Sequence, residues 1–553
     1  MAIKTASLTI FSMILILLSG CSIPADRGTQ TITGESLMTH IEILSSDEYE
    51  GRAPASRGED LTVDYLVSQL EEMGVDPGME DGSYIQEFPL LGQRVNAGSA
   101  EMSIRESGQN AVSLAYNTDF MAWPSNESES IDIENAEVVY VGYGIQAPEF
   151  EWDDFKGADV AGKILVFKNS DPSDDPDLFD GASRLYYGRW SYKFEKAAEM
   201  GALGAIVIHT TPTAGYGWDI VANSWGRERF SLRSGEEGTA NPEFNSWLTE
   251  EGSRSLFEAA GLSLDEMLEA AESREFEPVR LEGVTMNMKL EASYSDLTSK
   301  NVVGMIEGSD PDLMDEYVIF TAHHDHLGVG TPVNGDSVYN GARDNAAGVS
   351  AVLNLANALK EVETEMRRSA IFLFVGAEEM GLLGSLYWAN NPTVHPGKIS
   401  ANLNMDGMQT YGPTEDVVLV GYGRNTITDV IEQFASEAGR TVKPDPSPEQ
   451  GYFYRSDHFS MARVGIPAVF PRRGSEYIGK PEGWSATIDS VDAANYHAVS
   501  DEINEYWDID GMVDDLQLFY RSAFYIINAD EKMEWVAGDE FEAVRMEMLK
   551  EAE

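Results

Sequence analysis

Six side chains in the second half of the sequence combine imidazoles with carboxylates and could hold metal ions. Zinc binds histidine nitrogen and carboxylate oxygen, and a catalytic zinc site leaves one position for water. Two zinc ions about 3.5–4 Å apart can share one bridging carboxylate and one hydroxide, and the reaction also needs an unligated base. The chain supplies such a set in five short segments, namely His323, Asp344, Glu378 with Glu379, Asp406 and His497.

These side chains follow segments whose pattern predicts strands. Between about 296 and 530, apolar strand-like runs alternate with helix-like runs. This order is typical of an α/β domain in which a mostly parallel sheet carries helices on both faces. Ligands of such sheets bind beyond the carboxyl ends of the strands. His323 ends one such run, the glutamate pair follows the run 369–375 and Asp406 ends another, so the sequence predicts one common site.

Spacing alone leaves alternatives open at the first imidazole. His324 and His326 lie beside His323, and either could take its place as a ligand. On a strand, His323 and Asp325 share a face while His324 points away, which favours His323.

The five segments together resemble a known enzyme family. Residues 322–328 read AHHDHLG, 341–348 GARDNAAG, 374–381 FVGAEEMG, 403–407 LNMDG and 495–501 NYHAVSD. In this combination they are similar to the co-catalytic two-zinc exopeptidases, which include secreted bacterial leucyl aminopeptidases, glutamate carboxypeptidase and the transferrin receptor. The resemblance implies the α/β, phosphorylase/hydrolase-like fold of zinc exopeptidases over nearly all of the mature chain.

The resemblance also implies a role for each side chain. Glu378 would be the general base, and Asp325 would orient the imidazole of the first ligand. The setting of Tyr496 and Asp501 around the last histidine favours that histidine over its competitor, His458. We expect Tyr454, Asp457, His458 and Tyr496 to shape the substrate pocket. Two zinc ions, bridged by Asp344 and a water or hydroxide, would have the ligands His323, Asp344, Glu379, Asp406 and His497.

The implied activity is hydrolysis of N-terminal residues from peptides by a water that the two zinc ions activate. A carboxypeptidase or dipeptidase on the same scaffold is the alternative within the enzyme class, and it would need arginines for a terminal carboxylate. Glutaminyl cyclisation on a related single-zinc scaffold is disfavoured by the full bridging set. A non-catalytic receptor for peptides or proteins should have broken ligand positions, and none is broken here. Possible arginine sources are Arg343, Arg455, Arg472 and Arg473.

A β-rich segment is expected to interrupt the peptidase domain. Residues 110–290 contain several strand-like runs between loops rich in Asp, Pro and Gly. The stretch from Trp152 to Lys163, with the helix-like run 191–202, resembles a protease-associated domain. Such a module would cover the cleft and limit substrate size, or it would only add stability.

The N-terminal segment reads as a lipoprotein leader. Residues 1–21 have a short basic start, an apolar run and the ending Leu-Ser-Gly-Cys. This predicts lipid on Cys21 and an exported protein anchored in the periplasm or at the outer membrane. A tether over 22–34, an N-terminal part of the peptidase domain over 35–109 and the main zinc domain over 296–553 complete the predicted organisation.

The composition excludes one class of partner. The 553 residues include 94 acidic and 38 basic side chains, giving a formal net charge of -56. Nucleic acid is a poor partner for such a surface, because phosphate binding needs basic patches. Peptides are the expected substrates, and membrane contact is expected only through the lipid. The sequence specifies no oligomeric state.

Overall fold

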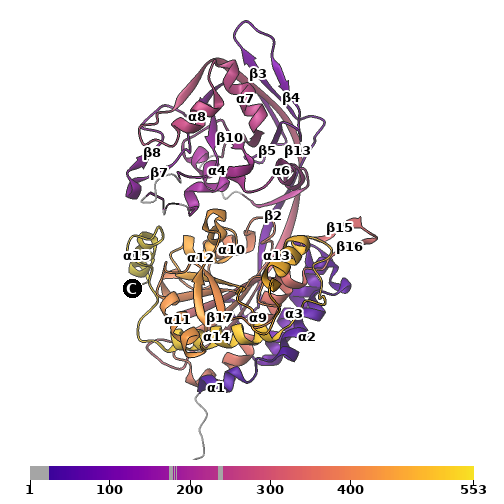
Figure 1. The fold of residues 1–553 in the computed structure, drawn as a ribbon, viewed down its shortest axis with the longest axis vertical. Coiled ribbons are helices and arrows are strands. Elements are labelled where there is room, and N and C mark those ends of the chain that lie inside the picture. The colour runs from indigo at the N-terminus through magenta and orange to yellow at the C-terminus, as the bar shows by residue number, and fades with distance from the viewer. Residues whose placement is uncertain (1–23, 173–177, 180, 182, 234–240, 553) are drawn as a thin grey trace, which may run out of the picture.

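The protein has two lobes joined by two long strands (Figure 1). The computed structural model describes residues 24–172, 178, 179, 181, 183–233 and 241–552. Strands β2 (Ile85–Val95) and β13 (Val279–Ile306) pair antiparallel and run from one lobe into the other. Cys21 and the predicted leader lie outside the described residues.

The lower lobe is built on a mixed sheet with a parallel centre. Four neighbouring strands are parallel, and antiparallel strands flank them on both sides. This confirms the predicted mostly parallel α/β sheet. The strand order is β2, β13, β17 (Ser369–Val375), β14 (Tyr317–His323), β18 (Ile399–Asn404), β21 (Ala468–Arg472), β19 (Asp416–Val420) and β20 (Thr441–Pro444).

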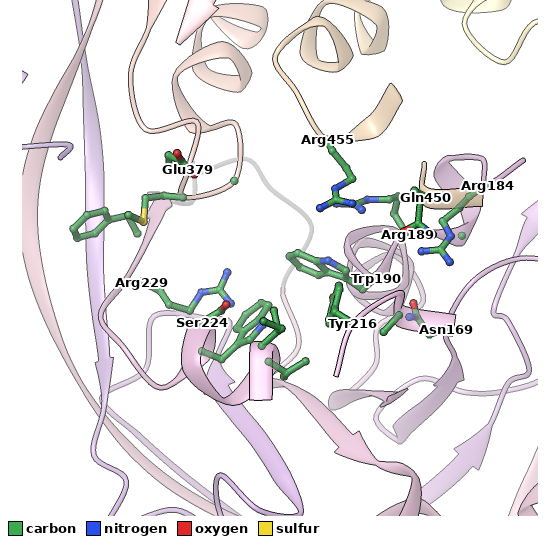
Figure 2. A pocket seen from close by; sticks show the side chains of 18 of the residues that line it. Asn169, Arg184, Arg189, Trp190, Tyr216, Ser224, Arg229, Glu379, Gln450 and Arg455 are labelled. Carbon is green, nitrogen blue, oxygen red and sulfur yellow. The ribbon is translucent and has the colours of Figure 1, made fainter. Parts of the chain in front are cut away.

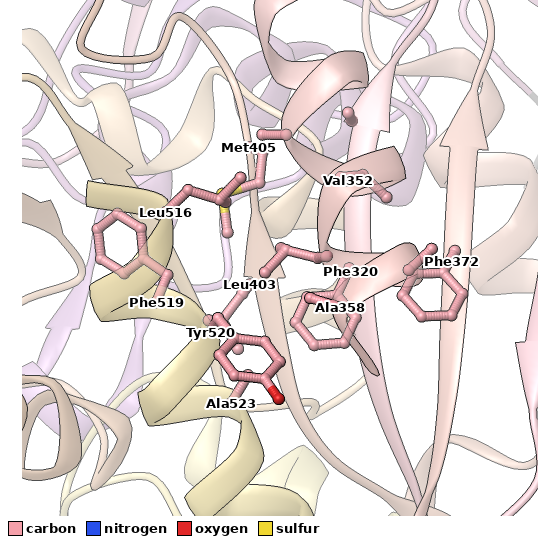
Figure 3. Close-up of a cluster of buried hydrophobic side chains, with 14 of the residues drawn as sticks. Phe320, Val352, Ala358, Phe372, Leu403, Met405, Leu516, Phe519, Tyr520 and Ala523 are labelled. Carbon is pink, nitrogen blue, oxygen red and sulfur yellow. The ribbon is translucent and has the colours of Figure 1, made fainter. Parts of the chain in front are cut away.

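Helices cover both faces of the central strands, because alternate side chains point to opposite faces. On β14, Val318 and Phe320 lie in one buried cluster while Ile319 lies in another. The first cluster is covered by α9 (Gly348–Lys360) and α14 (Asp510–Asn528), as Figure 3 shows around Phe320. The second is covered by α10 (Leu383–Asn390) and α12 (His458–Arg463), which contribute Trp388 and Met461.

The N-terminal helices pack on the same lobe. Helix α2 (Gly34–Leu44) contacts α9, and α3 (Arg57–Met73) contacts α9 and β13. Ser56 caps α3 by accepting hydrogen bonds from the backbone N–H groups of Gly58 and Glu59. Gly74 ends the helix with φ 70°, a left-handed conformation that glycine adopts readily.

The predicted tether over 22–34 is wrong for its described part. Residues Pro24–Thr29 form helix α1, which contacts α14 and α9. Arg521 on α14 pairs with Asp26 at 3.0 Å, and Gln517 donates a hydrogen bond to the carbonyl of Thr29 at 3.3 Å. These contacts hold the segment against the lobe, although its polar composition resembles that of a linker.

The upper lobe contains a second mixed sheet. Its strands run in the order β4 (Val112–Leu114), β3 (Glu101–Glu106), β13, β6 (Ser130–Tyr140), β9 (Ile164–Lys168), β10 (Gly204–His209), β12 (Phe244–Thr249) and β5 (Phe120–Pro124). Helices α4 (Trp190–Glu199) and α7 (Glu250–Ala259) pack on it. The lobe starts earlier than the expected residue 110, because β3 already belongs to its sheet. Its assignment as a protease-associated domain stays a prediction.

One strand, β11 (Arg229–Leu232), returns from the upper lobe to pair with β2 in the lower sheet. Along the described ranges of the chain, no helix is both long and apolar enough to cross a membrane.

Candidate metal centre

The predicted ligands come together at the carboxyl ends of the parallel strands. His323 is the last residue of β14, the glutamate pair begins three residues after the end of β17, and Asp406 lies two residues after the end of β18. Asp344 comes from the turn before α9, and its peptide bond to Asn345 is cis. The sheet thus brings distant segments to one edge, as expected for an α/β fold.

Asp344 lies at the centre of two groups of ligand atoms. Its Oδ1 is 3.2 Å from His323 Nε2, which is also 3.6 Å from Asp406 Oδ1. Its Oδ2 is 3.3 Å from His497 Nε2, which is 2.9 Å from Glu379 Oε2. The two oxygens of one carboxylate therefore face different pairs of ligands.

These spacings fit two zinc ions. Zinc–nitrogen and zinc–oxygen bonds of about 2.0–2.2 Å in a tetrahedron place neighbouring ligand atoms about 3.3 Å apart. The four distances around Asp344 lie between 2.9 and 3.6 Å. Each pair supplies one imidazole and one carboxylate. Asp344 could therefore bridge two ions. His323 and Asp406 would bind one of them, and Glu379 and His497 would bind the other.

The cluster is strongly polarised. Burial disfavours the charge on each carboxylate, but hydrogen bonds with His323 and His497 hold the pKa of Asp344 well below its usual range. Burial likewise opposes ionisation of Glu379, yet the nearby His497 brings its pKa down to about 2. Burial would lower the pKa of His497, but Glu379 and Asp344 raise it to about 11. The carboxylates thus favour a positive charge at this position, which a divalent cation would supply.

Glu378 borders this cluster and is the acid expected to move protons. It lines the cleft together with Glu379, Tyr496 and His497. Burial raises the pKa of Glu378 well above its usual range, although the neighbouring His323 opposes the shift. A raised pKa makes a carboxylate a better proton acceptor, as a general base requires.

Asp325 has different partners from those that the sequence suggests. Its carboxylate accepts hydrogen bonds from the backbone N–H groups of Glu378, at 3.0 Å, and Glu379, at 3.3 Å. Its Oδ1 lies 3.9 Å from His323 Nδ1, which is beyond hydrogen-bond range, and that nitrogen is 3.2 Å from the carbonyl oxygen of Asp325. The Asp325 carboxylate therefore fixes the turn that carries the glutamate pair, rather than the imidazole.

Of the four residues predicted for the substrate pocket, two border the cleft and two are buried. Tyr496 lines the cleft, and its ring stacks on that of His497 with centroids 3.9 Å apart. Tyr454 also borders the cleft, but its hydroxyl group bonds to Glu540. His458 is fully buried between Phe453 and Phe470, so its assignment to the pocket is wrong.

Asp457 is also fully buried, and it lies close enough to His323 to interact with it electrostatically. Burial raises the pKa of its carboxyl group to about 6. Asp457 does not border the described cavities, and it belongs to the layer beneath the ligands.

Three contacts to the ligands were not predicted from the sequence. His326 Nδ1 donates a hydrogen bond to Glu379 Oε1 at 2.6 Å. Ser456 donates its hydroxyl hydrogen to Asp406 Oδ2 at 2.7 Å. The carboxylate of Asp501 accepts the backbone N–H of Asp344 at 3.0 Å. The sequence suggests His326 only as an alternative to His323. Its place three residues after His323, beyond the end of the strand, is the one feature of the sequence that indicates a separate role.

A buried arginine holds the loops around the cluster together. The guanidinium of Arg52 donates to the carbonyl oxygens of His324 at 3.0 Å, Asn340 at 2.6 Å and Gly341 at 2.9 Å. These carbonyls belong to the segments that carry His323 and Asp344. Arg52 comes from the Gly- and Pro-containing loop before α3, so the N-terminal part of the chain completes the site.

A parallel sheet that gathers two sets of zinc-type ligands around one aspartate offers a site for two metal ions. Residues 301–518 match the model of Peptidase family M28.

Similar proteins cover part of the chain. Aminopeptidase YwaD of Bacillus subtilis (strain 168) is 32% identical over 236 residues, which are 39% of this chain and 48% of that protein. Leupeptin-inactivating enzyme 1 of Streptomyces exfoliatus is 28% identical over 215 residues, 38% of this chain and 44% of that protein. The chain thus spans less than half the length of these relatives.

The fold is also found in a solved structure. The aminopeptidase from Aneurinibacillus sp. strain AM-1 superposes with a TM-score of 0.50 at 19% identity, covering 91% of this chain and 95% of that one. At this identity the likeness concerns the fold, including both lobes.

Proposed function

We propose that the protein is a zinc-dependent exopeptidase, and specifically an aminopeptidase that removes N-terminal residues from peptides. The observation that carries the proposal is the position of Asp344, whose two oxygens each face one imidazole–carboxylate pair beside Glu378. The M28 match of residues 301–518 and the names of the similar proteins support the same activity. A non-catalytic receptor is disfavoured, because every predicted ligand is in place.

Different side chains would bind the metal ions and transfer the proton during hydrolysis. His323, Asp406, Glu379 and His497 would hold two zinc ions with Asp344 between them. Bound zinc supplies Lewis acidity, which polarises a carbonyl group and makes water more acidic. Glu378 would accept a proton from the attacking water and deliver it to the leaving amine. Asp325 keeps Glu378 in place through the backbone hydrogen bond of 3.0 Å.

Exchanging Glu378 for Gln tests the proposal. We expect Glu378→Gln to retain its zinc and to lose about 10²–10⁴-fold in kcat, because an amide cannot accept the proton. The measurement is hydrolysis of leucine p-nitroanilide and of short peptides, with zinc content determined on the same samples.

The matched control is Glu363→Gln, which makes the same exchange on a partly exposed residue that pairs with Lys360 and lines none of the cavities around the site. Its turnover should equal that of the wild type. Unchanged turnover in a zinc-loaded Glu378→Gln protein would show that another group moves the proton.

The remaining predictions concern the setting of the enzyme. The upper lobe would cover the cleft and restrict the size of the substrate, since its residues Tyr186 and Trp190 line the same cavity as Glu378. Export and a lipid on Cys21 remain predictions from the sequence, supported by the pattern of residues 1–21.

A further inference from the structure

Four arginines surround a cavity between the two lobes, next to the metal centre (Figure 2). Arg184 and Arg189 come from the upper lobe, and Arg455 comes from the lower lobe. Arg229 is the first residue of β11, the strand that pairs with β2 in the lower sheet. The cavity has a volume of about 330 Å³ and is also lined by the metal-ligand residue Glu379. In a chain with a net charge of -56, such a concentration of positive charge is unexpected.

None of these four guanidinium groups forms an ion pair with an acidic side chain of the described ranges. Other arginines near the cleft do have such partners. Arg463 lies 3.4 Å from Glu195, and Arg473 lies 2.7 Å from Asp492. Arg343 is 3.6 Å from Asp492 as well. Among the described residues, Asp171 and Glu449 act on the charge of Arg184. The charges of Arg189, Arg229 and Arg455 are the ones that a bound molecule can meet.

The protein holds these arginines in position by other means. The guanidinium of Arg229 stacks on the ring of Trp225 at 3.0 Å from its centroid. Arg184 donates a hydrogen bond to the carbonyl oxygen of Thr213 at 2.9 Å. Burial, reinforced by Arg455, lowers the pKa of Arg189 to about 10, so this side chain stays charged at neutral pH. Charged groups kept in a partly dry cavity favour an anion.

The cavity continues into the part of the cleft that holds the metal ligands. Arg455 lines the arginine cavity and also the neighbouring region that contains Asp344 and Asp406. Arg189 lines both the arginine cavity and the region that contains Glu378 and His497. A short peptide with its scissile bond at the metal centre could therefore extend into the arginine cavity.

We propose that this cavity binds a carboxylate of the peptide substrate and so determines which peptides are hydrolysed. The inference rests on the proposed peptidase function and adds the chemical class of the substrate. Planar guanidinium groups match carboxylates through paired hydrogen bonds, which makes them suited to this ligand. The carboxylate is either the C-terminus of a short peptide or the side chain of an acidic residue.

Binding of three tripeptides separates these two sources. Ala-Ala-Ala carries a terminal carboxylate, Ala-Glu-Ala amide carries only a side-chain carboxylate, and Ala-Gln-Ala amide carries neither. Affinities are measured by calorimetry on the full-length, zinc-loaded Glu378→Gln protein, with mass spectrometry to verify that the peptides stay intact. We expect one of the two carboxylate peptides to bind about tenfold more tightly than the neutral one, since a hydrogen bond to a charged group is worth about that factor.

Substitution of the arginines tests the assignment to this cavity. In the same background, Arg189→Gln and Arg455→Gln should each remove most of the tenfold preference and leave the affinity for Ala-Gln-Ala amide within twofold. Arg455 is exposed, so its exchange should not affect folding. Arg463→Gln is the matched control, because Arg463 lines the cleft but is paired with Glu195, and it should keep the preference.

Equal affinity for the three peptides would overturn the proposal, and so would a preference that survives both arginine substitutions. Neither result depends on turnover, because binding is measured in a variant made inactive. Loss of hydrolysis in the wild type would instead contradict the proposed function. The two failures are therefore distinguishable.

Discussion

At the scale of single residues, the site depends on one carboxylate, that of Asp344, which faces both pairs of ligands. Asp344 offers one oxygen to the side of His323 and the other to the side of His497. Its backbone is fixed by Asp501, and the turn bearing Glu379 is fixed by Asp325. Positioning by a second layer of hydrogen bonds is typical of metal centres, because it sets the orientation of each ligand.

His326 is the member of this second layer that can be tested alone. Its Nδ1–H group donates to Glu379 at 2.6 Å and so orients the carboxylate toward His497. We expect His326→Ala to weaken binding of one of the two zinc ions about 10–100-fold, as losses of such partners do. The two zinc affinities are measured by competition with a chromophoric chelator.

His395→Gln provides the control for that experiment, since His395 is a partly exposed cap of a short helix away from the cleft. Its two zinc affinities should equal those of the wild type. Wild-type affinities in the His326→Ala protein would mean that the hydrogen bond does not support the metal.

The ligand residues could be predicted from the sequence, but their partners could not. His323 and Asp406 stand at the ends of apolar runs, which is a local signal. The hydrogen bond of Asp325 to the turn of Glu378 joins residues that follow two different strands, and no local pattern specifies which backbone N–H group lies within reach. His458 looked like a polar pocket residue, yet aromatic rings enclose it.

At the scale of elements, the parallel strands account for the position of the site. Strands β14, β17 and β18 end at one edge of the sheet, so residues that follow them meet there. The alternation of strand and helix patterns predicted this arrangement. The connection between the lobes was not predictable in the same way, because β13 runs through the residues 290–296 at which the sequence suggested a boundary.

Helix α3 is tied to β13 by a buried acid. Glu59, in the first turn, accepts hydrogen bonds from Ser299 and from the backbone N–H of Ala55. Burial raises its pKa from 4.5 to about 7, although these hydrogen bonds oppose the shift. The folded protein therefore binds this proton more tightly than the unfolded chain does.

The pH dependence of stability follows from that shift. The contribution of Glu59 is fully present below pH 4.5 and is lost as the pH rises through about 7, a change of about 3 kcal/mol. We expect Glu59→Gln to remove this dependence, so that its melting temperature falls less than that of the wild type between pH 5 and pH 7.5.

Glu72→Gln, on an exposed position of the same helix, is the control and should follow the wild type. A Glu59→Gln protein with the same pH profile as the wild type would show that Glu59 is ionised at both pH values. The readout is the difference between two pH values, so a uniform loss of stability does not affect it.

At the scale of the whole molecule, the two lobes enclose the chemistry between them. The metal ligands come from the lower lobe, while two of the four cavity arginines, Arg184 and Arg189, come from the upper lobe. The overall acidity of the chain was evident from composition, but the gathering of arginines was not. They lie far apart in the sequence, and only the approach of the lobes brings Arg189 near Arg455.

The central claim is that five side chains hold two metal ions around Asp344, and the most direct test is the zinc content of the full-length protein. After loading and dialysis, elemental analysis should find two zinc ions per chain in the wild type, one in His323→Ala and none in Asp344→Ala. This order is expected because Asp344 alone belongs to both ligand sets. A wild-type protein with one ion or none, or an Asp344→Ala protein that keeps both, would contradict the account.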